Sequence, residues 1–311
     1  MSKAAFCAYG AAQTLAALQQ LETGGADLYR GSPLGQSSSK SMERAGAIES
    51  PLTPSLSPLT KGGEGEGSGG MQVPQVGTER EEADRNIPEE IWYQAAVRLH
   101  TCLTLFAPCF PRTRLAFWKR RLRRLIRALN ALRDHQHLLQ FIPKGRVRLR
   151  LQQRIEMQLS KAQQAWQRIQ HDHVLNEIRG LSRRLAGTTS EPAPTEIADY
   201  ARARWQELWR VNLKSLESAG QSVEVRWGRL QLMLTVAQML APLLPNEIPL
   251  GELQARYQQL SVERFRQRAR ALLTELKEQE RQLTLLYHGS LRGFRSVEQE
   301  FDKWIASSNA L

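Results

Sequence analysis

Apolar residues recur at the spacing of a helix along most of the chain, and signals for strands are nearly absent. Alternation of β-branched and polar residues, typical of a half-buried strand, never lasts four residues. Apolar positions three and four residues apart instead predict helices. These helices are expected at 3–22, 88–106, 112–142, 146–186, 195–218, 222–241, 250–286 and 296–306. The pattern therefore predicts an all-α fold, with two helical-bundle halves of long antiparallel helices.

Glycine and proline predict where these helices end. Gly24-Gly25 is expected to end the first helix, and Pro108 to end the second. Pro143 follows the helix predicted at 112–142, since proline lacks the N–H that a helix interior needs. The next helix is expected to continue unbroken to residue 186, just before Gly187.

A low-complexity stretch separates the first helix from the others. Residues 31–87 are rich in Gly, Pro and Ser, with isolated charges, and include a nearly continuous glycine run at 62–70. Such a composition buries too little apolar surface to offset its conformational entropy. We therefore expect a disordered insertion at 31–87, between a first helix at 1–30 and a basic helical half at 88–190. A second helical half is expected at 191–311.

The positive charge is concentrated in one part of the chain. The formal charge of the whole chain is +12, and residues 88–190 hold 20 basic against 6 acidic side chains. Within 112–154 there are 14 basic residues and a single acid, Asp134. A merely soluble helical face normally mixes both signs. The imbalance favours a polyanionic partner.

The helix predicted at 112–142 separates its apolar and basic residues by direction. On a wheel of 100° per residue, an apolar stripe runs from Trp118 to Leu132. The opposite side is a broad cationic face made of Lys119, Arg120, Arg123, Arg124 and Arg127. Arg133 falls within the apolar stripe, so we expect it to face the bundle interior and to need a partner from another helix or from a ligand. A structural ion pair is the favoured role for this arginine.

Other candidate chemistry is set aside. Neither His135/His137 nor His171/His173 can chelate one ion on an intact helix, because residues two apart point about 200° apart. No dinucleotide fingerprint or Walker loop occurs, so we expect neither catalysis nor a cofactor. The three cysteines, Cys7, Cys102 and Cys109, lack metal-ligand spacing and are expected to be reduced thiols. The longest apolar run, residues 230–244, is too short to span a bilayer. No membrane insertion and a cytoplasmic location are therefore expected.

The basic helix resembles one known family. Residues 118–139 are similar to a segment of the CHAD domain, the conserved-histidine α-helical domain, in which a long basic helix ends in an Arg-Asp pair followed by apolar residues. Arg133-Asp134 and Leu138-Leu139 match that pattern here. The resemblance covers residues 3–22 and 88–306. It implies two helical-bundle halves around a basic groove that binds inorganic polyphosphate without chemistry.

Two parts of the family pattern differ in this chain. Counting back from Phe106, the family's histidine position falls near Glu90, and its arginine positions fall near Tyr93 and Val97. In the second half, the expected basic helix carries only Arg226 and Arg229.

The sequence thus favours a non-enzymatic, polyanion-binding helical domain, with inorganic polyphosphate as the leading ligand. Two alternatives stay open: a degenerate helical scaffold for protein interaction, and sequence-independent nucleic-acid binding. The candidate binding residues are Arg98, His100, Lys119, Arg120, Arg121, Arg124, Arg127, Arg133, Arg226 and Arg229. No metal ligand is proposed.

Overall fold

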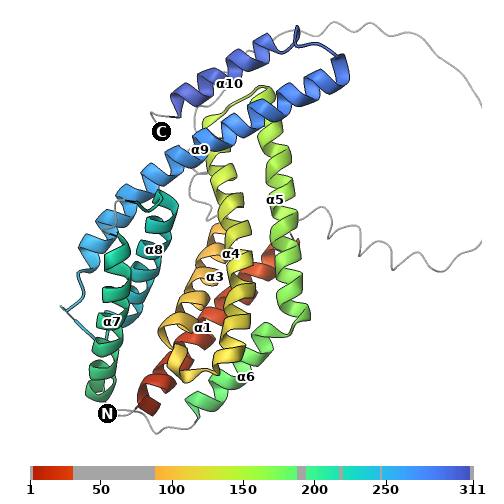
Figure 1. The fold of residues 1–311 in the computed structure, drawn as a ribbon. Helices are drawn as coiled ribbons and strands as arrows, with labels where there is room; N and C mark the ends of the chain where they lie inside the picture. Colours follow the sequence, from red (N-terminus) through yellow and green to blue (C-terminus); the bar gives the residue numbers. More distant parts are fainter. Residues whose placement is uncertain (1–2, 31–87, 188–193, 217–219, 246, 309–311) are drawn as a thin grey trace, which may run out of the picture.

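The protein is described by a computed structural model, which covers residues 3–30, 88–187, 194–216, 220–245 and 247–308 (Figure 1). In these ranges all regular structure is helical, which confirms the predicted all-α fold. The predicted disordered insertion at 31–87 lies outside the described residues. The elements are α1 (Lys3–Arg30), α3 (Pro88–Leu105), the 3₁₀ helix η1 (Ala107–Cys109), α4 (Arg112–Phe141), α5 (Arg146–His171), α6 (Val174–Ala186), α7 (Pro194–Leu216), α8 (Val223–Leu240), α9 (Leu250–His288) and α10 (Arg295–Ser307).

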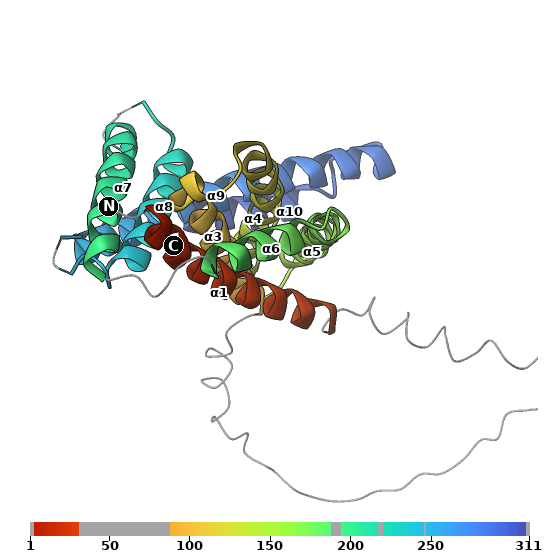
Figure 2. The same ribbon diagram turned by 90° about the horizontal axis from the view of Figure 1, so that it is seen from below.

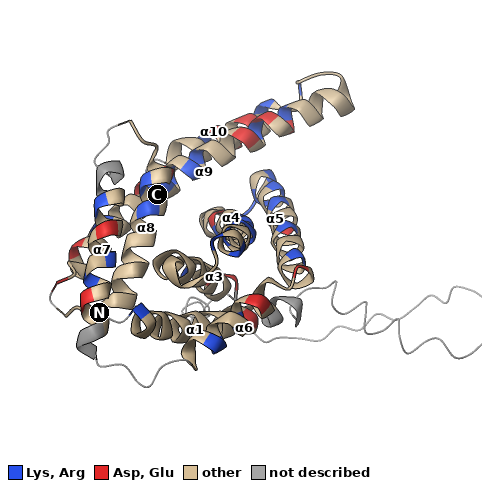
Figure 3. Cartoon of the chain, turned by 60° about the horizontal axis from the view of Figure 1, so that its bottom comes forward, with Lys and Arg blue, Asp and Glu red and all other residues tan. Residues whose placement is uncertain are grey.

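The helices form two groups with α3 between them. Seen from below, α7 and α8 lie on one side of α3, whereas α5 and α6 lie on the other (Figure 2). Helix α1 packs along α3 and α6, and α4 packs along α3 and α5. Lys and Arg are prominent on α4 and α5, whereas the long helix α9 carries both signs (Figure 3). The division of the chain at residue 190 stays a prediction.

Two hydrophobic cores hold these helices together. The main core contains residues of α1 and α3 to α9, including Trp118 and Leu122 of α4. A smaller core joins the end of α4, the start of α5, the middle of α9 and α10, with Leu138 and Phe301 among its members. Helices α4 and α9 contribute to both cores, so each is a continuous support between them.

The first helix extends beyond the point predicted from its glycines. Helix α1 continues to Arg30, so the prediction that Gly24-Gly25 ends it is wrong. The reason is packing, because a Cβ added at Gly25 would lie 2.7 Å from the ring of Trp166 and one at Gly24 3.3 Å from Trp92. These glycines allow close approach of neighbouring helices, and the helix tolerates their modest propensity cost.

The helix predicted at 146–186 is in fact two helices. Asp172 ends α5, and His173 adopts a left-handed conformation (φ 54°) before α6 begins at Val174. Histidine is among the residues that enter this region more readily than most. The break turns the chain so that α6 packs on α1.

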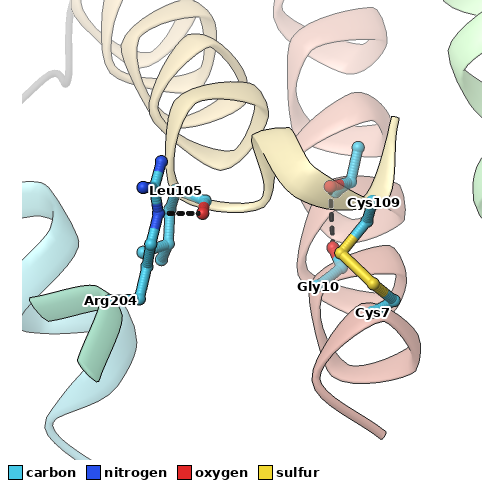
Figure 4. Close-up of a disulfide and its surroundings, with 6 residues drawn as sticks. Cys7, Gly10, Leu105, Cys109 and Arg204 are labelled. Atoms are coloured by element: carbon cyan, nitrogen blue, oxygen red, sulfur yellow. Dashed lines mark hydrogen bonds between the residues drawn. A yellow bond between two sulfur atoms is a disulfide. The ribbon is translucent and has the colours of Figure 1, made fainter. Parts of the chain in front are cut away.

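A disulfide joins the first helix to the segment that follows α3. Cys7 of α1 and Cys109 of η1 are bonded (Figure 4). Cys102 is a buried free thiol. The prediction of three reduced thiols is therefore wrong for two of them. Disulfides persist mainly in oxidising compartments, so the bond does not favour the cytoplasmic location, which stays a prediction.

We expect Cys7→Ser to lower the melting temperature by roughly 10 °C. The cysteines lie 102 residues apart, and the loss of a cross-link of this kind typically costs about 2–4 kcal/mol, since the unfolded chain regains entropy. Thermal unfolding followed by circular dichroism, with and without reductant, measures this effect. Reductant should destabilise the unmutated protein and leave Cys7→Ser unchanged. Equal melting temperatures for both proteins without reductant would contradict the prediction.

Candidate polyanion-binding site

Helix α4 places its predicted apolar stripe in the core and its cations outside. Trp118, Leu122, Leu125, Leu129 and Leu132 are at most 1 % exposed, as the wheel predicts. The predicted cationic face has four exposed arginines, Arg120, Arg123, Arg124 and Arg127, and one half-buried lysine, Lys119. The apolar stripe thus fixes the direction in which the cations project.

One side of this cationic face meets α5. Arg121, Arg124 and Arg127 line a cavity of about 340 Å³ between the two helices. Helix α5 adds two cations that the sequence analysis did not include, Lys161 and Arg168. They lie seven residues apart, two helical turns, and therefore project on one face. This spacing was the feature of the sequence from which the two cations could have been predicted to share a site. We call this cavity the α4–α5 pocket.

The other side of the cationic face meets α3 and α7. Here His100 of α3 lies close to Lys119 and Arg123 of α4, and Lys119 is also influenced by Arg204 of α7. We call these four residues the His100 cluster. Arg204 was not among the predicted site residues, because helix α7 is brought to α4 only by the tertiary fold. Arg123 was part of the predicted cationic face but not one of the candidate binding residues.

The His100 cluster is an electrostatically unfavourable place for further positive charge. Burial, and then the charges of Lys119 and Arg123, lower the pKa of His100 to about 3. Burial also lowers the pKa of Lys119, with contributions from Arg123 and Arg204. The Nε2 atom of His100 is buried without a hydrogen-bond partner among the described residues. A bound anion would relieve this repulsion and raise both pKa values.

Arg204 also has a structural task. Its Nε donates a hydrogen bond to the carbonyl oxygen of Leu105 (3.0 Å; Figure 4), and its Nη2 donates to that of Thr104 (3.0 Å). These carbonyls lie in the last turn of α3, where a helix leaves acceptors unpaired and favours a cation. Arg204 thus ties α7 to the end of α3.

Arg98 does not join His100. The two side chains lie two residues apart on α3 and so project about 200° apart. Arg98 contacts helix α1, where its Nη2 lies 3.3 Å from Oε1 of Gln13. The two predicted binding residues of α3 therefore do not form one site.

Arg133 is enclosed by the protein itself. Its Nη1 lies 3.4 Å from Oε1 of Glu90 on α3, and its guanidinium lies 4.3 Å from the ring centre of Tyr93 and 5.9 Å from that of Trp227. The predicted partner from another helix is thus Glu90, at the position where the family pattern has histidine. Tyr93 supplies an aromatic face where the pattern has arginine.

A buried ion pair next to Arg133 joins the two groups of helices. Asp134 of α4 accepts two hydrogen bonds from Arg264 of α9, at 3.0 and 2.8 Å. Arg264, whose side chain is only 3 % exposed, also donates through Nε to Glu224 of α8 at 2.9 Å. Its guanidinium lies 4.1 Å from the ring centre of Trp227. This role of Asp134 depends on α9 and was not predicted from the sequence.

The remaining candidates lie on α4 and α8. Arg120 is exposed, with its guanidinium 5.8 Å from the ring centre of Phe117. Arg226 faces Glu263 of α9, at 3.9 Å, and its Nε is buried without a partner among the described residues. Arg229 is half-buried on the same helix.

The described helices also bear on metal binding and membrane insertion. No group of three or more His, Cys, Asp or Glu side chains suited to a metal ion occurs in the described part of the chain. The helix does break between His171 and His173, but these histidines and Asp172 between them do not form such a group. None of the described helices is both long and apolar enough to cross a bilayer.

Comparison with known proteins identifies one family. The family model of the CHAD domain matches residues 94–229, which include all of α4, α5 and α6. No curated protein and no solved structure matches the chain. The matched segment contains the basic helix and its Arg133-Asp134 pair, the features that carried the resemblance in the sequence. The chain therefore carries a CHAD domain at residues 94–229.

Proposed function

We propose that this protein is a non-enzymatic polyanion-binding domain whose ligand is inorganic polyphosphate. The CHAD domain at residues 94–229 supports this proposal, since polyphosphate binding is what the family resemblance implies. The observation that carries it is the state of the exposed cations on α4. Arg120, Arg123, Arg124 and Arg127 have no acidic partner among the described residues, whereas the more buried Arg121 and Arg133 are paired with Asp172 and Glu90.

Unpaired cations at this spacing work against the folded helix. Arg120 and Arg124, and likewise Arg123 and Arg127, lie four residues apart and repel each other by a few tenths of a kcal/mol per pair. Some cations of other helices are instead paired with acidic side chains, as where Lys277 of α9 contacts Asp302 of α10 at 2.8 Å. A polyanion laid along α4 would remove the repulsion.

Arginine is the suitable cation for a chain of phosphates. Its planar guanidinium can donate two parallel hydrogen bonds to phosphate oxygens, and it keeps its charge at any cellular pH. Binding through such contacts needs no nucleophile or general base, and the sequence has no catalytic motif that would supply one.

Titration of the unmutated protein with long-chain polyphosphate, double-stranded DNA and RNA, at 50 and 200 mM salt, tests the proposal. We expect polyphosphate to bind most tightly. Its affinity should fall steeply with salt, by roughly three to five decades if 6–10 phosphate contacts form as on DNA, because each contact releases counterions. Tighter binding of DNA or RNA would favour the nucleic-acid alternative. If none of the three binds at 50 mM salt, the scaffold alternative replaces this proposal.

A further inference from the structure

We propose that the α4–α5 pocket binds a short run of linked phosphate groups, held jointly by cations of both helices. This inference rests on the proposed function and adds a location to it: a cavity separate from the His100 cluster and built in part by α5. Nine residues line the cavity, five of them cationic and none acidic: Arg121, Arg124, Arg127, Lys161, Arg168, Gln158, Gln164, Ala128 and Ala165.

The pocket follows from the spacing of residues on two neighbouring helices. On α4, Arg121, Arg124 and Arg127 recur every three residues, so they form one row along the helix. On α5, Lys161 and Arg168 lie two turns apart on one face. A short connection joins the two helices, which lie side by side (Figure 1). The two rows therefore face each other across the cavity.

Four of the five cations carry uncompensated charge. Arg124, Arg127, Lys161 and Arg168 make no ion pair with any described residue, and all four are exposed. Their repulsion across a shared cavity is reduced only by solvent and salt. Bringing together so many unpaired cations favours a ligand with several negative charges, because a single carboxylate would leave most of them unneutralised.

Arg121 anchors one end of the pocket and has bonding capacity left. Its Nη2 lies 2.5 Å from Oδ2 of Asp172, which fixes the side chain, and its guanidinium lies 5.3 Å from the ring centre of Phe117. Its Nε is buried without a hydrogen-bond partner among the described residues. A buried donor left unpaired is costly, and a phosphate oxygen in the pocket is an acceptor of the right kind.

The size and the other lining residues agree with linked phosphates. A volume of about 340 Å³ lies near the lower end of small-ligand pockets, so the cavity admits a few phosphate groups and excludes a folded protein or a duplex. The amides of Gln158 and Gln164 can donate further hydrogen bonds to phosphate oxygens, and the two alanines leave the space open.

The test is calorimetric titration of the full-length protein with inorganic tripolyphosphate and with long-chain polyphosphate. The pocket variant is Lys161→Glu/Arg168→Glu on α5. Arg266→Glu/Arg270→Glu on α9 is its control, since it changes the net charge equally at two exposed arginines away from the pocket. Circular dichroism checks the fold, and Lys161→Gln/Arg168→Gln serves if the reversal variant fails to fold.

We expect the pocket variant to bind tripolyphosphate about a hundredfold more weakly, roughly tenfold for each lost charged contact. The α9 control should retain tripolyphosphate affinity within about threefold. If the unmutated protein binds polyphosphate and the pocket variant binds tripolyphosphate equally well, the pocket is not the site, although the proposed function stands. If the unmutated protein binds neither probe, the proposed function itself fails.

Discussion

Replacing Arg120, Arg124 and Arg127 together by glutamate is expected to abolish polyphosphate binding without changing the helicity of the protein. All three side chains are exposed and point away from the buried stripe of α4. The substitutions lower the formal charge of +12 by six and place negative charge where the phosphates would lie. Losing three contacts and adding repulsion should weaken binding by at least three decades at 50 mM salt. Titration with long-chain polyphosphate measures the effect.

A matched reversal separates this local effect from the loss of overall charge. Arg210 of α7 and Arg266 and Arg270 of α9 are exposed arginines outside α4. Their joint replacement by glutamate changes the net charge equally. If binding depends on the cationic face of α4, this control should lose about tenfold or less through long-range electrostatics. Equal losses in the two triple variants would show that only net charge matters.

Asp134→Ala is expected to destabilise the protein by about 3 kcal/mol or more. The substitution removes the acceptor of two hydrogen bonds from Arg264, whose guanidinium stays buried with only the half-exposed Glu224 opposite. Breaking a buried ion pair by removing one partner costs about 3–5 kcal/mol, because it leaves an uncompensated charge. The melting temperature should fall by roughly 10 °C.

An exposed ion pair on the same long helix is the control. Asp302→Ala removes one of the two acidic partners of Lys277, the other being Glu298, and Asp302 is exposed. Pairs of this kind contribute about 1 kcal/mol or less, so this variant should melt within a few degrees of the unmutated protein. Chemical denaturation of both variants measures the difference in unfolding free energy. Similar small losses for both would mean that Asp134 does not link α4 to α9 as described.

Local patterns were sufficient to predict the helices and the orientation of α4. The period of its leucines placed Trp118 to Leu132 in the core and the arginines outside, and it placed Arg133 toward the interior. Such predictions need only the geometry of one helix. The predicted end of α1 was wrong because the local sequence around Gly25 does not show that Trp166 packs against it. The break at His173 carries no glycine or proline that would have marked it.

The candidate site was predicted only in part, because it depends on which helices meet. The cations of α4 were identified from their one-sided charge, but their division between α5 and α3/α7 follows from tertiary packing. Lys161 and Arg168 could be recognised as site residues only once α5 was seen to pack beside α4. The same limit explains the disulfide, since nothing in the spacing of three cysteines indicates that residues 7 and 109 meet.

The bond between Cys7 and Cys109 gives α1 a second covalent attachment besides the peptide chain between the two cysteines. The polypeptide from residue 7 to residue 109 is a covalent ring, closed by sulfur at one point. A cut at any peptide bond from 31 to 87 would open this ring without releasing α1, which would stay attached to the CHAD-matched segment through η1. The first helix would thus stay covalently attached even if the segment that connects it to α3 were cut.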